Sequence, residues 1–184
     1  MRTNLMRAIR CISALAVSWA ASLAPLHAGE PSLDPHLEVL RPLLEKTWKG
    51  HFKNSRPDKP VVDVARWERA LNGKAVRILH SVNDGIYGGE TLITWDEAKQ
   101  SLVYHYFTTA SNNTIGTLNS REGKFVTDEV VSGSAGGVTE VRATTELLAD
   151  GTLHVKAEYL KNGEWVPGHE VSYKEDASAK VVFK

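Results

Sequence analysis

Tight-turn dipeptides recur between β-forming segments of this chain, and they constrain its fold more than any other feature. Asn-Gly or Asp-Gly stands at four such places: Asn72-Gly73, Asp84-Gly85, Asp150-Gly151 and Asn162-Gly163. These pairs favour two-residue β-hairpins, because both central residues of the turn take positive φ angles. Their recurrence at strand spacing predicts a series of antiparallel hairpins.

Ten β-forming segments are separated by these and other turn sequences. Their approximate bounds are 48–52, 61–71, 74–82, 89–95, 101–109, 114–120, 124–131, 138–148, 152–161 and 165–173. No amphipathic segment of helix length interrupts the series, which excludes parallel βαβ units. The expected fold is all-β: a single antiparallel up-and-down β-barrel of about ten strands, closed so that no strand edge stays unpaired. Apolar residues at helical spacing in 37–48 predict a short helix before the barrel, broken by Pro42.

The first 28 residues have the pattern of a cleaved secretory signal peptide. Three arginines precede an apolar run at residues 11–26, and small and polar residues follow it. The run is shorter than the ~20 residues of a membrane-spanning helix, and Pro25 interrupts it, so cleavage after Ala28 is favoured over a retained anchor. The expected location is the periplasm or the medium.

Three regions follow from this interpretation. Residues 1–28 are the signal peptide, residues 29–36 a tether and residues 37–184 the barrel domain. The mature chain has no cysteine and three more acidic than basic residues. Thiol nucleophiles and thiolate metal sites are therefore excluded, and the charge provides no basic field for nucleic acid. No membrane span is expected in the mature form.

No catalytic or metal-binding motif is present, so neither a catalytic residue nor a metal site is predicted, and enzymatic activity stays open. Alternation along the strands instead supplies candidates for a small-molecule site. Glu140 and Arg142 share one face, and two orientations are open: an inward one, in which arginine would bind a carboxylate as in fatty-acid-type barrels, and an outward, solvated stripe. The candidate ligand contacts are His80, Tyr104, Tyr106, Glu140, Arg142 and His169.

The short helix, the segment 44–50 that opens the first strand and the ten-segment meander resemble the calycin superfamily. That group includes lipocalins, fatty-acid-binding proteins and nitrobindin-like haem barrels. Trp48 matches the tryptophan that closes one end of a calycin barrel, whereas Lys46 stands where the superfamily carries glycine. Residues 37–184 also resemble uncharacterised exported bacterial proteins.

The resemblance implies three functions. The first is an exported carrier of a small apolar or amphiphilic molecule, with the cofactor unknown. The second is a haem-binding barrel, because nitrobindin-like proteins ligate haem iron through a histidine near the chain end, where His169 stands. The third is an envelope interaction or inhibitor protein that acts through surface loops, for which 54–60 and 133–137 are the natural surfaces.

Overall fold

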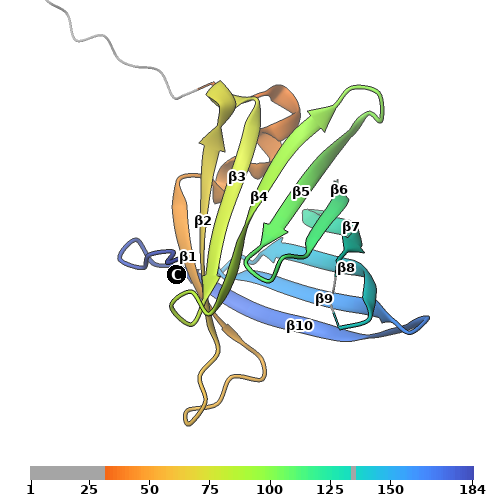
Figure 1. Ribbon diagram of the computed structural model, residues 1–184. Helices are drawn as coiled ribbons and strands as arrows, with labels where there is room; N and C mark the ends of the chain where they lie inside the picture. The colour runs from red at the N-terminus through yellow and green to blue at the C-terminus, as the bar shows by residue number, and fades with distance from the viewer. Residues whose placement is uncertain (1–31, 134–135) are drawn as a thin grey trace, which may run out of the picture.

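The ten strands form one closed antiparallel barrel in the computed structural model, which describes residues 32–133 and 136–184 (Figure 1). Each strand pairs with its sequence neighbours, and the first closes against the last, with Trp48 opposite Glu175. The expected all-β barrel is confirmed. The strands are β1 (Lys46–Phe52), β2 (Val62–Ala70), β3 (Ala75–Val82), β4 (Tyr87–Asp96), β5 (Ser101–Thr108), β6 (Asn113–Arg121), β7 (Lys124–Ser132), β8 (Val138–Leu147), β9 (Leu153–Lys161) and β10 (Glu164–Glu175).

The turn dipeptides connect strands as expected. Asn72 and Gly73 have φ angles of 54° and 87°, and Asn162 and Gly163 have 53° and 84°. At Asp150-Gly151 only the glycine is in the left-handed region. Asn162-Gly163 forms the expected two-residue turn between the paired residues Lys161 and Glu164, whereas Asn72-Gly73 lies in a four-residue turn between Ala70 and Ala75.

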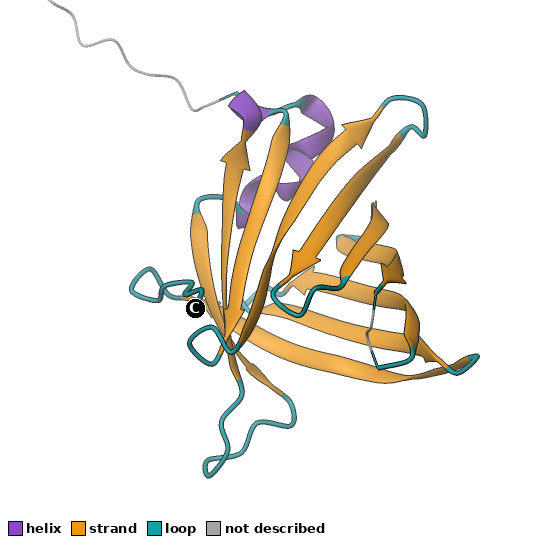
Figure 2. Ribbon diagram, viewed as in Figure 1, coloured by secondary structure: helices purple, strands orange, loops and turns teal. Residues whose placement is uncertain are grey.

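A short helix, η1 (Pro35–Leu43), covers one end of the barrel (Figure 2). It is a 3-10 helix, in which residues three apart share a face, so Leu37, Leu40 and Leu43 all point inward and are at most 1% exposed. Pro42 suits this geometry better than an α-helix, because in an α-helix its ring would clash with the carbonyl four residues earlier. Asp34 caps the helix by accepting from the His36 N–H at 3.1 Å.

Part of the segment expected to be a tether packs on the barrel. Leu33 is 8% exposed, and the Asp34 N–H donates to the Gly73 carbonyl at 2.8 Å. The predicted signal peptide at residues 1–28 lies outside the described residues. No helix within the described part of the chain is long and apolar enough to cross a membrane.

The barrel interior is filled at the η1 end. The leucines of η1 pack there with Trp48, which is 2% exposed and whose indole N–H donates to the Leu43 carbonyl at 3.3 Å. The other core side chains at this end come from β2 to β7 and β9: Trp67, Val76, Ile93, Leu102, Leu118, Phe125 and Leu153. Trp67 and Leu153 also border the cavity at the opposite end.

Candidate functional site

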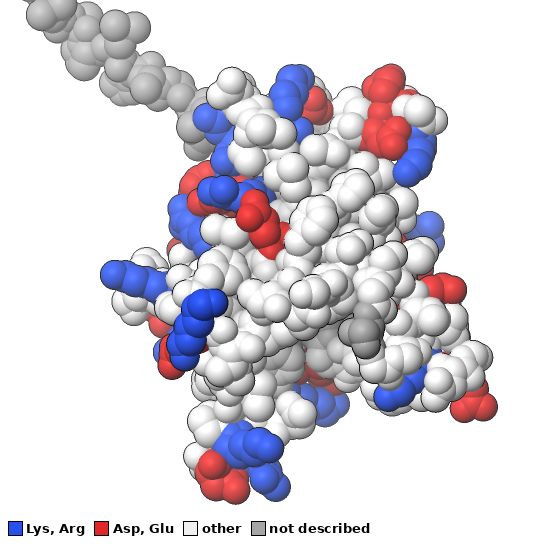
Figure 3. Space-filling view, viewed as in Figure 1, with Lys and Arg blue, Asp and Glu red and all other residues white. Residues whose placement is uncertain are grey.

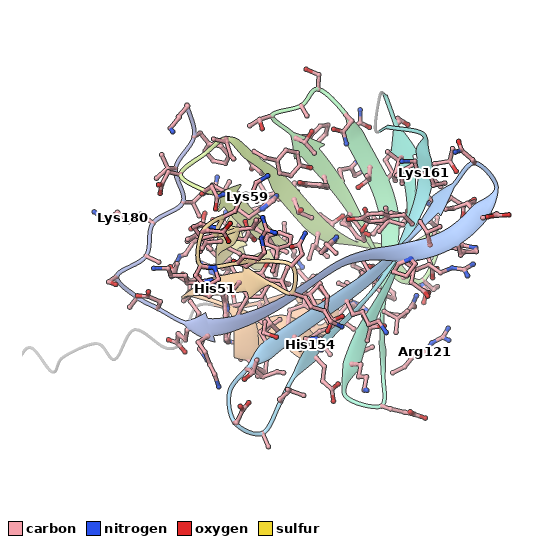
Figure 4. The ribbon with its side chains drawn as sticks, turned by 90° about the horizontal axis from the view of Figure 1, so that it is seen from below. His51, Lys59, Arg121, His154, Lys161 and Lys180 are labelled. Carbon is pink, nitrogen blue, oxygen red and sulfur yellow. The ribbon has the colours of Figure 1, made fainter. Side chains whose placement is uncertain are left out.

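The half of the barrel away from η1 contains a cavity of about 730 Å³. Its walls come from all ten strands, near the ends joined by the β1–β2, β3–β4, β5–β6, β7–β8 and β9–β10 connections. Figure 4 views the barrel from this side. Apolar and aromatic side chains together make up most of the lining, among them Phe52, Trp67, Ile78, Val131, Val141 and Val155. A concave, mainly apolar space with a few polar groups is the usual form of a small-molecule site.

The polar part of the lining has a distinct composition. All five tyrosines of the chain border the cavity: Tyr87, Tyr104, Tyr106, Tyr159 and Tyr173. Two carboxylates and two histidines join them, whereas no described lysine or arginine does. The labelled side chains of Arg121 and Lys180 point away from the barrel (Figure 4). The interior is therefore aromatic and acidic.

A chain of hydrogen bonds runs across five strands on one side of the cavity. Asp63 of β2 accepts from the Tyr173 hydroxyl at 2.7 Å and contacts His80 Nδ1 at 2.9 Å. His80 Nε2 lies 2.8 Å from the Tyr106 hydroxyl, which lies 3.0 Å from the Tyr87 hydroxyl. Asp63 is 3% exposed, so these bonds replace the water that its carboxylate loses on folding.

One assignment of protons satisfies every link of this chain. If His80 carries its proton on Nδ1, it donates to Asp63 and leaves Nε2 to accept from Tyr106. Tyr106 can then accept from Tyr87. Burial raises the pKa of both Tyr106 and Tyr173, with Asp63 adding to each rise, so these hydroxyls stay protonated as donors. These hydrogen bonds fix the orientation of three phenol rings on the cavity wall, those of Tyr87, Tyr106 and Tyr173.

A second pair lies on the β9–β10 side. The Tyr159 hydroxyl and His169 Nδ1 are 2.7 Å apart, and the Phe52 ring lies 6.2 Å from the imidazole. Burial lowers the pKa of His169 below its ordinary value of 6.5, and His80 adds to this effect while Asp63 opposes it. The imidazole is therefore held neutral at physiological pH, with Nδ1 bound to Tyr159.

The second carboxylate of the cavity is Glu129 of β7. It lies beside the hydroxyls of Tyr104 on β5 and Thr114 on β6. Burial raises the pKa of Glu129, and the two hydroxyls counteract part of the rise. The charge of Glu129 contributes to raising the pKa of Tyr104, Tyr106 and Tyr159 in turn, which places its carboxylate within electrostatic reach of most of the cavity.

Four of the candidate residues from the sequence meet at this cavity: His80, Tyr104, Tyr106 and His169 all line it. Trp48 lies at the opposite, closed end beneath η1. Strand alternation predicted the inward orientation of His80 on β3 and His169 on β10, because apolar or aromatic residues share their parity.

Glu140 and Arg142 are not among the cavity-lining residues, so the inward orientation of these two candidates is wrong and the outward alternative holds. Arg142 is exposed, its Nε lies 3.2 Å from an Asp128 carboxylate oxygen, and its guanidinium stacks 4.1 Å from the Trp165 ring centre. Val141 lines the cavity between them, and the pairing register shifts between Val138 and Glu140. Neighbouring residues of a strand face opposite ways. Because Val141 faces the cavity, Glu140 and Arg142 on either side of it face outward.

Sequence reasoning missed Asp63 and Glu129, both of which line the cavity. A signal for each was present. Asp63 shares strand parity with Ala65 and Trp67, and Glu129 shares parity with Phe125, and an aromatic residue on the same face marks that face as inward.

The surface loops and the surface charge indicate no particular partner. The loop at 54–60 extends beyond the open end of the barrel (Figure 1), and the loop at 133–137 is described only in part. On the face shown in Figure 3, basic and acidic side chains are interspersed and form no broad patch of one sign. Within residues 32–133 and 136–184, no three potential ligands are grouped to hold a metal ion.

Comparisons with known proteins support the fold alone. The crystal structure of Rv2717c from M. tuberculosis superimposes with a TM-score of 0.57, covering 79% of this chain and 99% of that one at 13% sequence identity. No family model and no curated protein matches the sequence. At that identity a shared barrel does not transfer a function, so function is argued from the cavity.

Proposed function

We propose that this protein is an exported barrel of the calycin type that binds a small, partly apolar molecule in its cavity. One observation carries the proposal: the interior is packed at the η1 end and hollow at the other, where about 730 Å³ is bordered by apolar walls and oriented phenols. An interior that served stability alone would be filled, because unfilled volume costs free energy. The helix before β1 and the buried Trp48 support the calycin assignment.

Nile red, an uncharged dye whose emission rises in apolar surroundings, tests this proposal on the full chain. Val131 lines the cavity, whereas its neighbour Val130 is 62% exposed on the outer face. We expect Val131→Trp to fill part of the cavity and to weaken Nile red binding about tenfold or more, the loss of roughly 1.4 kcal/mol. Val130→Trp is the matched control and should bind like the parent. Equal binding by the parent and both variants would place the dye outside the barrel and contradict the proposal.

Haem binding is a second candidate, and His169 is the observation that favours it. With Nδ1 bonded to Tyr159, Nε2 has no partner among the described residues and can face the cavity. A neutral imidazole whose other nitrogen is held by a hydrogen bond is the usual form of an axial ligand. His169 would therefore be the residue that holds the group, and bound haem would supply redox-active iron.

Titration with haemin, followed in the visible spectrum, tests the second candidate. We expect an intense absorption band typical of histidine-ligated haem, and its loss in His169→Ala. His154→Ala is the control, because His154 lies outside the cavity lining and contacts Glu170 at 3.4 Å. A spectrum identical in the parent and His169→Ala removes haem from consideration.

A further inference from the structure

Three polar side chains meet on the β5–β7 wall with hydrogen-bonding capacity unused. Tyr104 and Thr114 are only 5% and 4% exposed, and neither hydroxyl has a hydrogen-bond partner of ordinary geometry among the described residues. Both lie beside Glu129, and no basic side chain is among the groups that shift the pKa of its carboxyl. Buried polar groups without partners are rare in folded proteins, because each costs free energy.

Strand register brings this cluster together. Tyr104 on β5 lies opposite Gly116 on β6, which lies opposite Glu129 on β7. A Cβ at Gly116 would come within 2.6 Å of Tyr104 Cζ and Oη, so the phenol occupies the space that a side chain on β6 would fill. The glycine thereby allows the Tyr104 hydroxyl to cross β6 toward Glu129.

Glu129 is free to bind a ligand, whereas Asp63, the other carboxylate of the cavity, is already hydrogen-bonded within the protein. Asp63 already has Tyr173 and His80 as partners. Within the described part of the chain, the Tyr104 and Thr114 hydroxyls are the side-chain groups that act on Glu129, and a carboxylate in an apolar cavity needs a cation or several donors to remain ionised. The missing component of the cluster is therefore a positively charged donor.

We propose that Glu129, Tyr104 and Thr114 bind the ammonium group of an organic amine whose apolar body occupies the cavity. The proposal rests on the proposed binding function and names the class of ligand. An ammonium has three N–H donors and no acceptor. It matches one carboxylate and two hydroxyl oxygens, and each hydroxyl can donate to Glu129 while accepting from the ammonium.

The rest of the cavity favours a cation over an anion. It is lined by two carboxylates and by no described lysine or arginine, so an anionic head group would meet repulsion and no counterion. Five tyrosines border it, and the faces of aromatic rings attract cations. Arg142 lies outside the cavity, so the hypothesis that it binds a ligand carboxylate there is wrong.

Calorimetric titration of the full chain with three indoles tests the proposal. Tryptamine, tryptophol and indole-3-acetate share one apolar body and carry an ammonium, a hydroxyl and a carboxylate, respectively. We expect tryptamine to bind at least about tenfold tighter than the other two, since charge-assisted hydrogen bonds are the stronger ones. Glu129→Gln should bring tryptamine to within about threefold of tryptophol.

Asp128→Asn is the matched control, because Asp128 precedes Glu129 but pairs with Arg142 outside the cavity. It should keep the preference for tryptamine, and a thermal unfolding transition should show that both variants are folded. Equal affinity of the parent for all three indoles, or a preference that survives Glu129→Gln, overturns the amine assignment. So does failure of tryptamine to bind a barrel that takes up Nile red. Failure of all four probes instead overturns the proposed binding function itself.

Discussion

The ring of Tyr173 occupies the space above Gly50, so that a Cβ on this glycine would lie 2.5 Å from Tyr173 Cδ1. Gly50 pairs with Tyr173 on one side and with Asp63 on the other. The tyrosine on β10 thus reaches across β1 and donates its hydroxyl to Asp63 on β2 at 2.7 Å. The same arrangement of tyrosine, glycine and carboxylate occurs at Glu129, which indicates that glycines in the wall help to shape the polar side of the cavity.

Gly50→Ala should therefore act through Tyr173. We expect the added methyl group to displace the ring and lower the free energy of unfolding by about 1–3 kcal/mol, as overpacking does elsewhere. The closest atoms are all side-chain atoms of Tyr173 and Val171, so a smaller side chain at 173 should relieve the clash. In a double-mutant cycle, Gly50→Ala should cost less in a Tyr173→Leu background than in the parent. Strict additivity in urea unfolding would contradict this contact.

Asp63 is expected to matter most for stability among the cavity residues. Asp63→Ala would remove the acceptor of Tyr173 and the partner of His80 together, leaving buried groups unsatisfied. We expect a loss of about 2–4 kcal/mol in the free energy of unfolding. Asp58→Ala provides the comparison, since the side chain of Asp58 is 76% exposed in a surface pair, and it should change stability by less than about 0.5 kcal/mol.

The barrel was largely predictable from the sequence, because turn chemistry is local. Asn162-Gly163 forms the two-residue turn that its composition predicts, and alternation on β3 placed His80 on the inner face. Both features depend only on residues close together in the chain.

The charged half of the site was not predictable in the same way. Acidic residues are mostly exposed, so Asp63 and Glu129 read as surface residues although aromatic neighbours share their parity. At Arg142 the error was the reverse, because both faces of β8 carry polar residues and the shift in register near Val138 is invisible in the sequence. Which carboxylate has a partner depends on strands that are distant in the chain.

His169 should give stability a distinct pH dependence. Its pKa is lowered in the folded protein, so below pH 6.5 the unfolded chain takes up a proton that the native imidazole does not. The contribution of His169 to the free energy of unfolding should thus rise with pH between the folded-state pKa and 6.5. That contribution is lost as the pH falls through this window. Urea unfolding across this window should show a smaller rise in His169→Gln, whereas His154→Gln should keep it. An unchanged slope in His169→Gln would refute this account of the buried imidazole.

Export makes a separate prediction about processing. We expect protein recovered from the periplasm or the medium to begin at Gly29, because residues 1–28 carry the order of a signal peptide. Ala28→Trp would place a large residue at the cleavage position and should leave the longer precursor. N-terminal sequencing decides the matter, and a soluble exported pool that retains Met1 would contradict cleavage.

The central claim is that the open half of the barrel holds a small molecule, and native mass spectrometry of the protein purified from its own compartment tests it most directly. We predict a species heavier than the bare chain by the mass of one small molecule, converted to the bare mass by denaturation and depleted in Val131→Trp but not in Val130→Trp. The bare mass in every preparation, with no added mass after incubation with Nile red or tryptamine, would contradict it.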